Sequence, residues 1–237
     1  YFLIGNRQEQ ITNDIYDDLN PRFANGDKKI VFASNRKSDT LSTREKIAPL
    51  TENKDVFAYD FLRRSPLLER ITNTPGVDES SPQGYGSGEY TYLSNQNGII
   101  NRYWGLYDST ISHVDTTVHY RYFTNTYALS NVSRDIEYYD YDVFNNEYSM
   151  VTYECGKYKF YIGNKRDDEP IRPDQLPYST LKESEKVNKA INNTDMSILD
   201  LEHKQREKAL TNDKSKKEDV TFLNADGVSY TKEVIRI

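Results

Sequence analysis

The feature that most constrains this chain is an internal repeat. The same dipeptides return along the sequence, two of the pairs with the same offset of 60: Thr12-Asn13, Thr72-Asn73 and the looser Ser130-Asn131, then Ser34-Asn35 and Ser94-Asn95. Each copy runs through an acidic loop, a short strand, a tight turn and a strand of aromatic and β-branched residues. Such a unit cannot bury both faces of its sheet alone, so it stacks on its neighbours. We therefore expect a repeated surface, which is more often a binding platform than a catalyst.

The first copy predicts four short antiparallel strands, at residues 20–23, 29–34, 55–60 and 67–72. Asn25-Gly26 separates the first two strands and accepts the positive φ angles of a hairpin turn. The strand at 29–34 is mostly apolar, as expected for a strand buried on both faces. Four such strands make up one propeller blade.

The later copies repeat this order with departures. The second predicts strands at 81–83, 89–94, 102–107 and within 119–129; the third predicts strands at 136–141, 148–153 and 157–162, without a clear fourth. Residues 1–4 and 8–12 are expected to be the last two strands of an earlier blade. The fold predicted is all-β, a partial β-propeller of four-stranded antiparallel blades.

Certain residues recur at fixed places in these copies. The first contains Asp17-Asp18, Pro21, Phe23, Asn25-Gly26 and the run from Ile30 to Arg36; the second contains Asp78, Pro82, Gly86 and Leu93-Ser94-Asn95, with Gln83-Gly84 in place of the aromatic. These copies resemble the TolB-like, WD-type propeller repeat of bacterial envelope proteins. The third copy matches only at Asp135 and in its strand rhythm, so the resemblance covers roughly residues 1–162. The abundant tyrosines and long insertions are similar to large envelope proteins of Bacteroidota.

The number of blades has a consequence for the length of the protein. A propeller closes with about four to eight blades, whereas this chain holds three copies and part of another. We therefore expect a piece of a longer protein; the alternative is a complete small open β-sheet domain.

The sequence changes character after residue 163. We expect blades over 1–163, a proline-containing linker over 164–180, a charged helical or partly disordered segment over 181–218, and a β-hairpin over 219–237. Apolar side chains at heptad-like spacing mark a partner-binding seam in the third segment: Val187, Ile191, Ile198 and Leu201. The alternative is an amphipathic helix on its own propeller. Two strands alone are marginal in water, so the hairpin must join another sheet.

Composition and motifs exclude several classes of function. The net charge of −6 argues against nucleic-acid binding, and no run of 18 apolar residues exists, so membrane association would pass through partners or other segments. There is no nucleophile elbow and no phosphate-binding loop. We expect no enzymatic activity and no cofactor.

Metal sites receive little support from the spacing of ligands. His113 and His119 match no standard zinc spacing, and Asp140-x-Asp142 continues into Phe144 where calcium needs an oxygen ligand. The carboxylates that precede the inner strands are weak candidates for a cation in a central channel, or else cap turns: Asp17, Asp18, Asp78 and Asp135. Cys155 is expected to be a small buried residue.

Two further sets of residues are candidates for contacts and modification. An exposed aromatic insertion containing Tyr103, Trp104 and Tyr107 is a candidate partner contact, although ordinary packing also explains Trp104. The resemblance to Bacteroidota proteins implies O-glycosylation at Asp-Ser/Thr sites in inter-strand insertions, here at Thr40, Ser109 and Thr116.

The function expected from these patterns is a non-catalytic protein–protein interaction scaffold. The resemblance implies a subunit of a hetero-complex of envelope proteins, in the periplasm or at the outer membrane. One alternative is a carbohydrate- or peptidoglycan-binding module that uses tyrosine and tryptophan platforms. Another is the accessory propeller of a hydrolase whose catalytic domain lies outside this chain.

Overall fold

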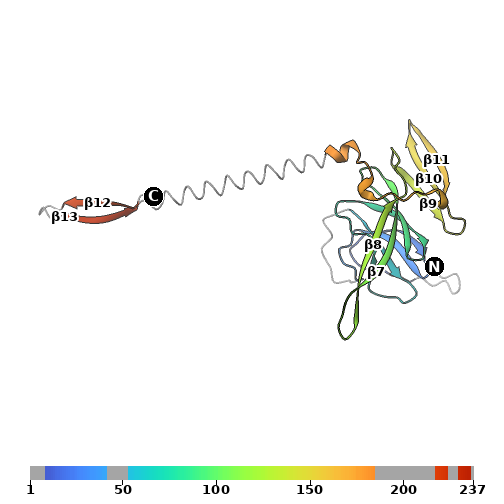
Figure 1. The fold of residues 1–237 in the computed structure, drawn as a ribbon, viewed down its shortest axis with the longest axis horizontal. Helices are drawn as coiled ribbons and strands as arrows, with labels where there is room; N and C mark the ends of the chain where they lie inside the picture. The colour runs from blue at the N-terminus through green and yellow to red at the C-terminus, as the bar shows by residue number, and fades with distance from the viewer. Residues whose placement is uncertain (1–8, 42–52, 185–216, 224–228, 236–237) are drawn as a thin grey trace. The chain divides into compact units, whose positions relative to one another are not determined.

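The computed structural model describes residues 9–41, 53–184, 217–223 and 229–235. The chain divides into two compact units, Tyr1–Ser179 and Thr180–Ile237. The described residues of the first unit form three antiparallel sheets (Figure 1).

The sheets follow one another along the chain. The first consists of β1 (Asp18–Ala24), β2 (Lys29–Ser34), β3 (Asp55–Asp60) and β4 (Glu69–Arg70). The second consists of β5 (Glu79–Gly86), β6 (Glu89–Ser94), β7 (Asn101–Val114) and β8 (Val118–Ala128). The third consists of β9 (Ile136–Asp142), β10 (Glu147–Glu154) and β11 (Lys157–Asn164). In each sheet, neighbours in sequence are neighbours in space, so the predicted all-β fold of blade-like sheets is confirmed.

The turn chemistry of the sequence fixes the registers of these strands. Asn25 and Gly26 have φ angles of 56° and 63° between β1 and β2, as the Asn-Gly signal predicts. The predicted strands 29–34, 55–60 and 89–94 coincide with β2, β3 and β6. One prediction is wrong: residues 9–12 form no strand, while residues 1–4 and residue 8 lie outside the described part of the chain.

Apolar layers lie between successive sheets. Val31, Val56 and Ala58 of the first sheet pack with Tyr90 and Tyr92 of the second in one buried cluster. A separate buried cluster joins the second sheet to the third: Tyr85, Leu93, Leu129, Ile136, Tyr139 and Tyr141. The sheets are therefore stacked face to face in chain order, as blades are.

The inner strands of the first two sheets approach closely at Gly84. A Cβ atom at this position would lie 3.1 Å from the Cβ atom of Ala24. The neighbouring Gln83, which replaces the aromatic of the first copy, uses its buried amide as a bridge. Its Oε1 accepts from the backbone N–H of Tyr141 at 2.9 Å, and its Nε2 donates to the carbonyl of Tyr139 at 3.2 Å. The departure from the repeat thus joins β5 to β9.

The repeated Thr/Ser residues cap the third strand of each four-stranded sheet. Thr72 Oγ1 accepts a 2.7 Å hydrogen bond from the backbone N–H of Val56, and Ser130 Oγ accepts one of 2.9 Å from that of Arg102. The first residue of each of these third strands in turn accepts a hydrogen bond from a backbone N–H two residues after the Thr or Ser. Asp55 Oδ1 accepts from the N–H of Thr74 at 3.0 Å, and Asn101 Oδ1 accepts from that of Val132 at 2.9 Å. We call these four contacts the strand caps.

We expect the strand caps to be measurable in stability. The substitutions Thr72→Val and Ser130→Ala leave a backbone N–H without its partner, which should lower the free energy of unfolding by about 1–3 kcal/mol each. Urea unfolding monitored by tryptophan fluorescence checks this. The matched controls are the exposed Thr110→Val and Ser133→Ala, and equal losses in caps and controls would contradict the assignment.

The segment after β11 packs against the sheets, although its sequence, the predicted proline-containing linker over 164–180, has little propensity for a packed element. It contains the short helices η1 (Lys165–Asp167) and η2 (Pro173–Gln175). Ile171 exchanges two backbone hydrogen bonds with Ala128, of 2.7 and 2.9 Å, and Leu176 is buried in the first apolar cluster. Asp168 lies 2.6 Å from the guanidinium of the buried Arg102. A buried charge needs a partner, so Arg102 holds this segment against the blade.

The second unit contains the predicted hairpin. β12 (Lys217–Leu223) and β13 (Ser229–Ile235) pair antiparallel in regular register, and residues 180–184 are helical. The predicted seam residues Val187, Ile191, Ile198 and Leu201 lie outside the described residues. No helix in the described parts has the length and apolarity needed to cross a membrane.

Candidate functional site

The third sheet presents apolar side chains to solvent. Cross-strand register places five of them on one face, with the exposed fractions given: Tyr138 (68%), Tyr153 (49%), Tyr158 (70%), Phe160 (66%) and Ile162 (72%). Val151 lies among them and pairs with both Phe160 and Tyr138. We call this surface the outer aromatic face.

The two faces of this sheet differ in a way that strand periodicity explains. Tyr139, Tyr141 and Met150 alternate with the exposed residues and pack into the cluster beneath the second sheet. Among the described residues the sheet has three strands, so one edge of β11 carries backbone groups without a strand partner. The outer aromatic face and this edge are the surfaces that a further blade or a partner protein would cover.

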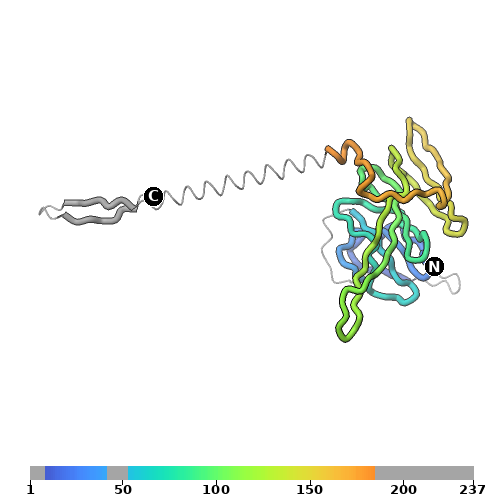
Figure 2. The backbone as a smooth tube through the Cα atoms, viewed as in Figure 1, coloured from blue at the N-terminus to red at the C-terminus, as the bar shows by residue number. Residues whose placement is uncertain are grey.

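A concave feature lies beside the projecting β7–β8 hairpin, which extends past the other strands (Figure 2). It is a cleft of about 710 Å³ with an aromatic wall, in which Tyr107 and Tyr122 stack with centroids 5.7 Å apart. Arg70 also lines the cleft. Its guanidinium donates to Asp39 at 2.6 Å and to Asp55 at 3.0 Å, and it lies over the ring of Phe57. The cleft therefore combines flat aromatic surface with a fixed charge.

Glu79 is a buried carboxyl group close to this region. It occupies the place that Asp18 occupies in the first sheet, where Asp18 receives two hydrogen bonds of 2.7 and 2.8 Å from Arg36. Glu79 instead receives a 3.1 Å hydrogen bond from Thr74 Oγ1. Burial raises the pKa of Glu79 to about 8; the charges of Asp55 and Asp78 add to the rise, and hydrogen bonds from Thr72 and Thr74 oppose it.

This raised pKa predicts a pH-dependent stability. Below the ordinary value of 4.5 the carboxyl is protonated in both states, whereas between 4.5 and about 8 only the unfolded chain releases its proton. The stabilisation is therefore fully present below pH 4.5 and is lost as the pH rises through about 8. Glu79→Gln should remove this decline and be on the order of 1–3 kcal/mol more stable than the wild type at about pH 9. Urea unfolding across this pH range tests it; the exposed Glu137→Gln should change nothing, and an unaltered decline in Glu79→Gln would refute the assignment.

The structure does not bring the four predicted channel carboxylates together. Asp78 and Asp135 each accept a hydrogen bond from the backbone N–H that precedes the third strand of the previous sheet, from Lys54 at 3.1 Å and Ile100 at 2.7 Å. Asp18 pairs with Arg36, and Asp17 with Asn35. Among the described residues, these carboxylates belong to no cluster with metal-ligand spacing. Asp78 and Asp135 accept backbone hydrogen bonds, as the turn-capping alternative requires, whereas Asp18 forms an ion pair with Arg36.

The predicted aromatic insertion is corrected, because these residues form the inner part of β7. Tyr103 is fully buried in the first apolar cluster, and Trp104 is half-buried and stacks on Tyr127 with centroids 5.2 Å apart. Tyr107 lines the cleft described above. The aromatic residues that predicted a contact surface are instead the inward-facing residues of a strand.

The cysteine and one of the predicted glycan sites, Ser109, differ from expectation in their surroundings. Cys155 is exposed, in the turn between β10 and β11, with a φ angle of 49°. Ser109 lies in β7 opposite Tyr122 and not in a loop, and Thr40 forms an isolated bridge with Leu67. Thr116 lies in the turn between β7 and β8, as the insertion hypothesis requires. Glycosylation stays a prediction at all three hydroxyls.

The structure assembles one cluster that sequence reasoning rejected. His113 and His119 lie opposite each other across the β7–β8 hairpin, and Asp115 of its turn lies beside both. The linear spacing matches no standard zinc motif because the hairpin, and not a helix or knuckle, brings these side chains together. The signal that could have found them is the pairing of two strands around residues 115–117.

Comparisons with known proteins find matches among solved structures only. No protein-family model matches the chain, and no curated protein matches it. Among solved structures, the crystal structure of TolB from Acinetobacter baumannii matches with a TM-score of 0.39 and 15% sequence identity. The match covers 64% of this chain but only 31% of that one. The WD-type assignment and the Bacteroidota source stay predictions from the repeat residues.

Proposed function

We propose that this chain is a non-catalytic interaction module that holds another protein against the outer aromatic face. The observation that supports this proposal is the exposure of five large apolar side chains on one face of the third sheet, each at least 49% accessible. Soluble proteins rarely leave such a patch uncovered. Tyrosine and phenylalanine are also enriched at interfaces, and tyrosine is among the residue types on which binding energy concentrates.

The chemistry of this surface specifies the kind of partner. A partner strand can add to the edge of β11 that is unpaired in the described residues, through main-chain hydrogen bonds, while the apolar side chains on one side of that strand pack beside Tyr158, Phe160 and Ile162. The partner we propose is therefore a protein with an exposed, apolar β-strand. The resemblance of the first two copies to envelope-protein repeats supports placing this complex in the bacterial envelope, at the periplasm or outer membrane.

The proposal predicts the effect of a charge in the middle of the face. Phe160→Glu would require a partner to bury a carboxylate, so recovery of the partner should fall by about tenfold or more. The measurement is affinity purification of the full-length protein from its native membranes, followed by quantitative mass spectrometry. Leu62→Glu is the matched control, because Leu62 is 70% exposed in the β3–β4 connection, away from this face.

Two results would contradict the proposal. One is recovery of the same partners, in the same amounts, with Phe160→Glu and with the wild type. The other is a purified chain that sediments as a dimer and becomes a monomer on the Phe160→Glu substitution, since the face would then be covered by a second copy.

A second candidate function, saccharide binding, is favoured by the cleft. The parallel rings of Tyr107 and Tyr122, at an interplanar angle of 6°, provide a flat apolar surface beside the hydrogen-bonding groups of Asp39 and Arg70. Sugar rings have apolar faces and polar edges that suit such a cleft. An accessory role beside a hydrolase domain stays a prediction about sequence outside this chain.

If the cleft binds saccharides, Tyr107→Ala should weaken the binding of peptidoglycan fragments by about fivefold or more, which corresponds to ~1 kcal/mol. Calorimetric titration measures this directly. Tyr120→Ala removes an exposed ring from the same hairpin that does not line the cleft, so it should have no effect. Absence of binding by the wild type, or equal effects of the two variants, would count against this candidate.

A further inference from the structure

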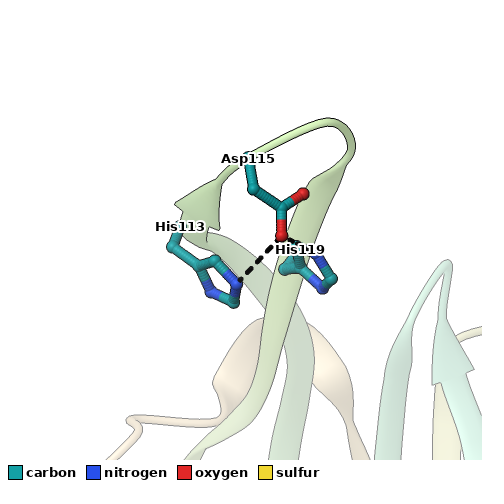
Figure 3. Close-up of side chains that lie close together, drawn as sticks. All are labelled: His113, Asp115 and His119. Atoms are coloured by element: carbon teal, nitrogen blue, oxygen red, sulfur yellow. Dashed lines mark hydrogen bonds and ion pairs between the residues drawn. The ribbon is translucent and has the colours of Figure 1, made fainter.

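The tip of the β7–β8 hairpin gathers three potential metal ligands (Figure 3). His113 Nε2 lies 3.9 Å from Asp115 Oδ2, and His119 Nε2 lies 3.1 Å from the same oxygen. One ligand atom from each residue can be chosen so that all lie within 4.8 Å of one another. The two imidazole rings stack in parallel with centroids 4.1 Å apart. All three side chains are exposed to solvent.

The turn fixes the carboxylate so that one oxygen faces the histidines. Asp115 Oδ1 accepts a 2.8 Å hydrogen bond from the backbone N–H of Thr117, and the hydroxyls of Thr116 and Thr117 lie 3.5 and 3.3 Å away. The other oxygen, Oδ2, makes both contacts with the histidines. Hydrogen bonds of this kind to the non-ligating atom orient carboxylate ligands in metal sites. The local structure thus supplies the outer support that a metal site needs.

A β-bulge sets the pairing of the histidines. Ile111 pairs with Tyr120, but the register then shifts so that His113, and not Ser112, lies opposite His119. β-bulges commonly re-aim side chains at functional sites. Directly paired residues on antiparallel strands hold their Cβ atoms about 5 Å apart, which suits two imidazoles on one ion.

We propose that His113, Asp115 and His119 bind a divalent transition-metal ion, with Zn²⁺ as the best fit. Two imidazoles and one carboxylate are ligands that Zn²⁺ accepts, whereas Mg²⁺ and Ca²⁺ prefer oxygen alone. In a tetrahedral zinc site, neighbouring ligand atoms lie about 3.3 Å apart, given bond lengths of about 2.0–2.1 Å. The separation of Oδ2 from His119 Nε2 already matches this value. His113 Nε2, which lies 3.9 Å from Oδ2, reaches the same separation by a rotation of its exposed ring.

Three protein ligands leave a coordination position open on a projecting hairpin. That position can take a water molecule or a donor group from another molecule. The site is separate from the outer aromatic face, which lies on β9–β11, and does not depend on the function proposed for that face.

The test is calorimetric titration of the chain with ZnCl2 alone. The protein for this titration is prepared without a histidine tag and with the Cys155→Ser substitution, because an exposed thiol also binds zinc. The expected result is one ion per chain, with a dissociation constant that rises at least about tenfold in His113→Ala, His119→Ala and Asp115→Asn. With Co²⁺ in place of zinc, visible absorption bands should appear in the parent chain and be lost in the same variants.

Controls separate this site from adventitious binding. His203→Ala removes the third histidine of the chain and should leave zinc binding unchanged. Circular dichroism of the metal-free variants should match the parent, since the substituted side chains are exposed. Absence of zinc binding by the parent chain would overturn the proposal, and so would binding that the His113→Ala/His119→Ala double variant retains.

Discussion

The satisfaction of backbone groups at the start of each third strand is the constraint on which the rest of this structure depends. Where one sheet passes to the next, the N–H groups of Val56 and Arg102 lose their ladder partners and need other acceptors. Thr72 and Ser130 provide them at 2.7 and 2.9 Å, while Asp78 and Asp135 accept from the residues just before each strand. The repeated residues therefore connect one sheet to the next through hydrogen bonds, and their spacing fixes how the sheets stack.

The buried ion pairs differ between the first and second sheets. The first sheet pairs Arg36 with Asp14 and Asp18, so its buried guanidinium is compensated by carboxylates on the same repeat. In the second sheet, Arg102 of β7 is the buried cation, and its carboxylate partner is Asp168, which lies 66 residues later in the chain. The ring of Tyr148, 3.5 Å from the guanidinium, completes this site. The third sheet and the segment after it are thereby tied to the second sheet by one cation.

Two parts of the fold do not connect one sheet to another. The outer aromatic face continues the series of apolar layers that elsewhere lie between sheets, but in the described residues no element covers it. The β7–β8 hairpin extends beyond its sheet and carries ordered side-chain contacts at its tip. Core packing requires neither feature. Exposed apolar area and structured projections are features that interaction sites in proteins commonly share.

Local sequence determined the elements and their turns. The strands over 29–34, 55–60 and 89–94 follow from short apolar runs bounded by turn residues, and Asn25-Gly26 follows from the need for positive φ. These signals act over a few residues, so they can be read without knowing the fold. The packed segment around Leu176 could not be predicted in this way, because its prolines describe only its extended backbone.

Tertiary structure alone decided which side chains meet. The alternation in β7 is the same whether Tyr103 faces a core or a partner, and only the stacked sheets show that it is buried. His113 and His119 are separated along the chain by a spacing that matches no metal motif, yet a hairpin and a one-residue bulge place them opposite each other. The sequence determines period and turn chemistry because these are local properties. Burial, pairing of distant charges and convergence of ligands are properties of the folded chain, since they depend on which surfaces come to lie against one another.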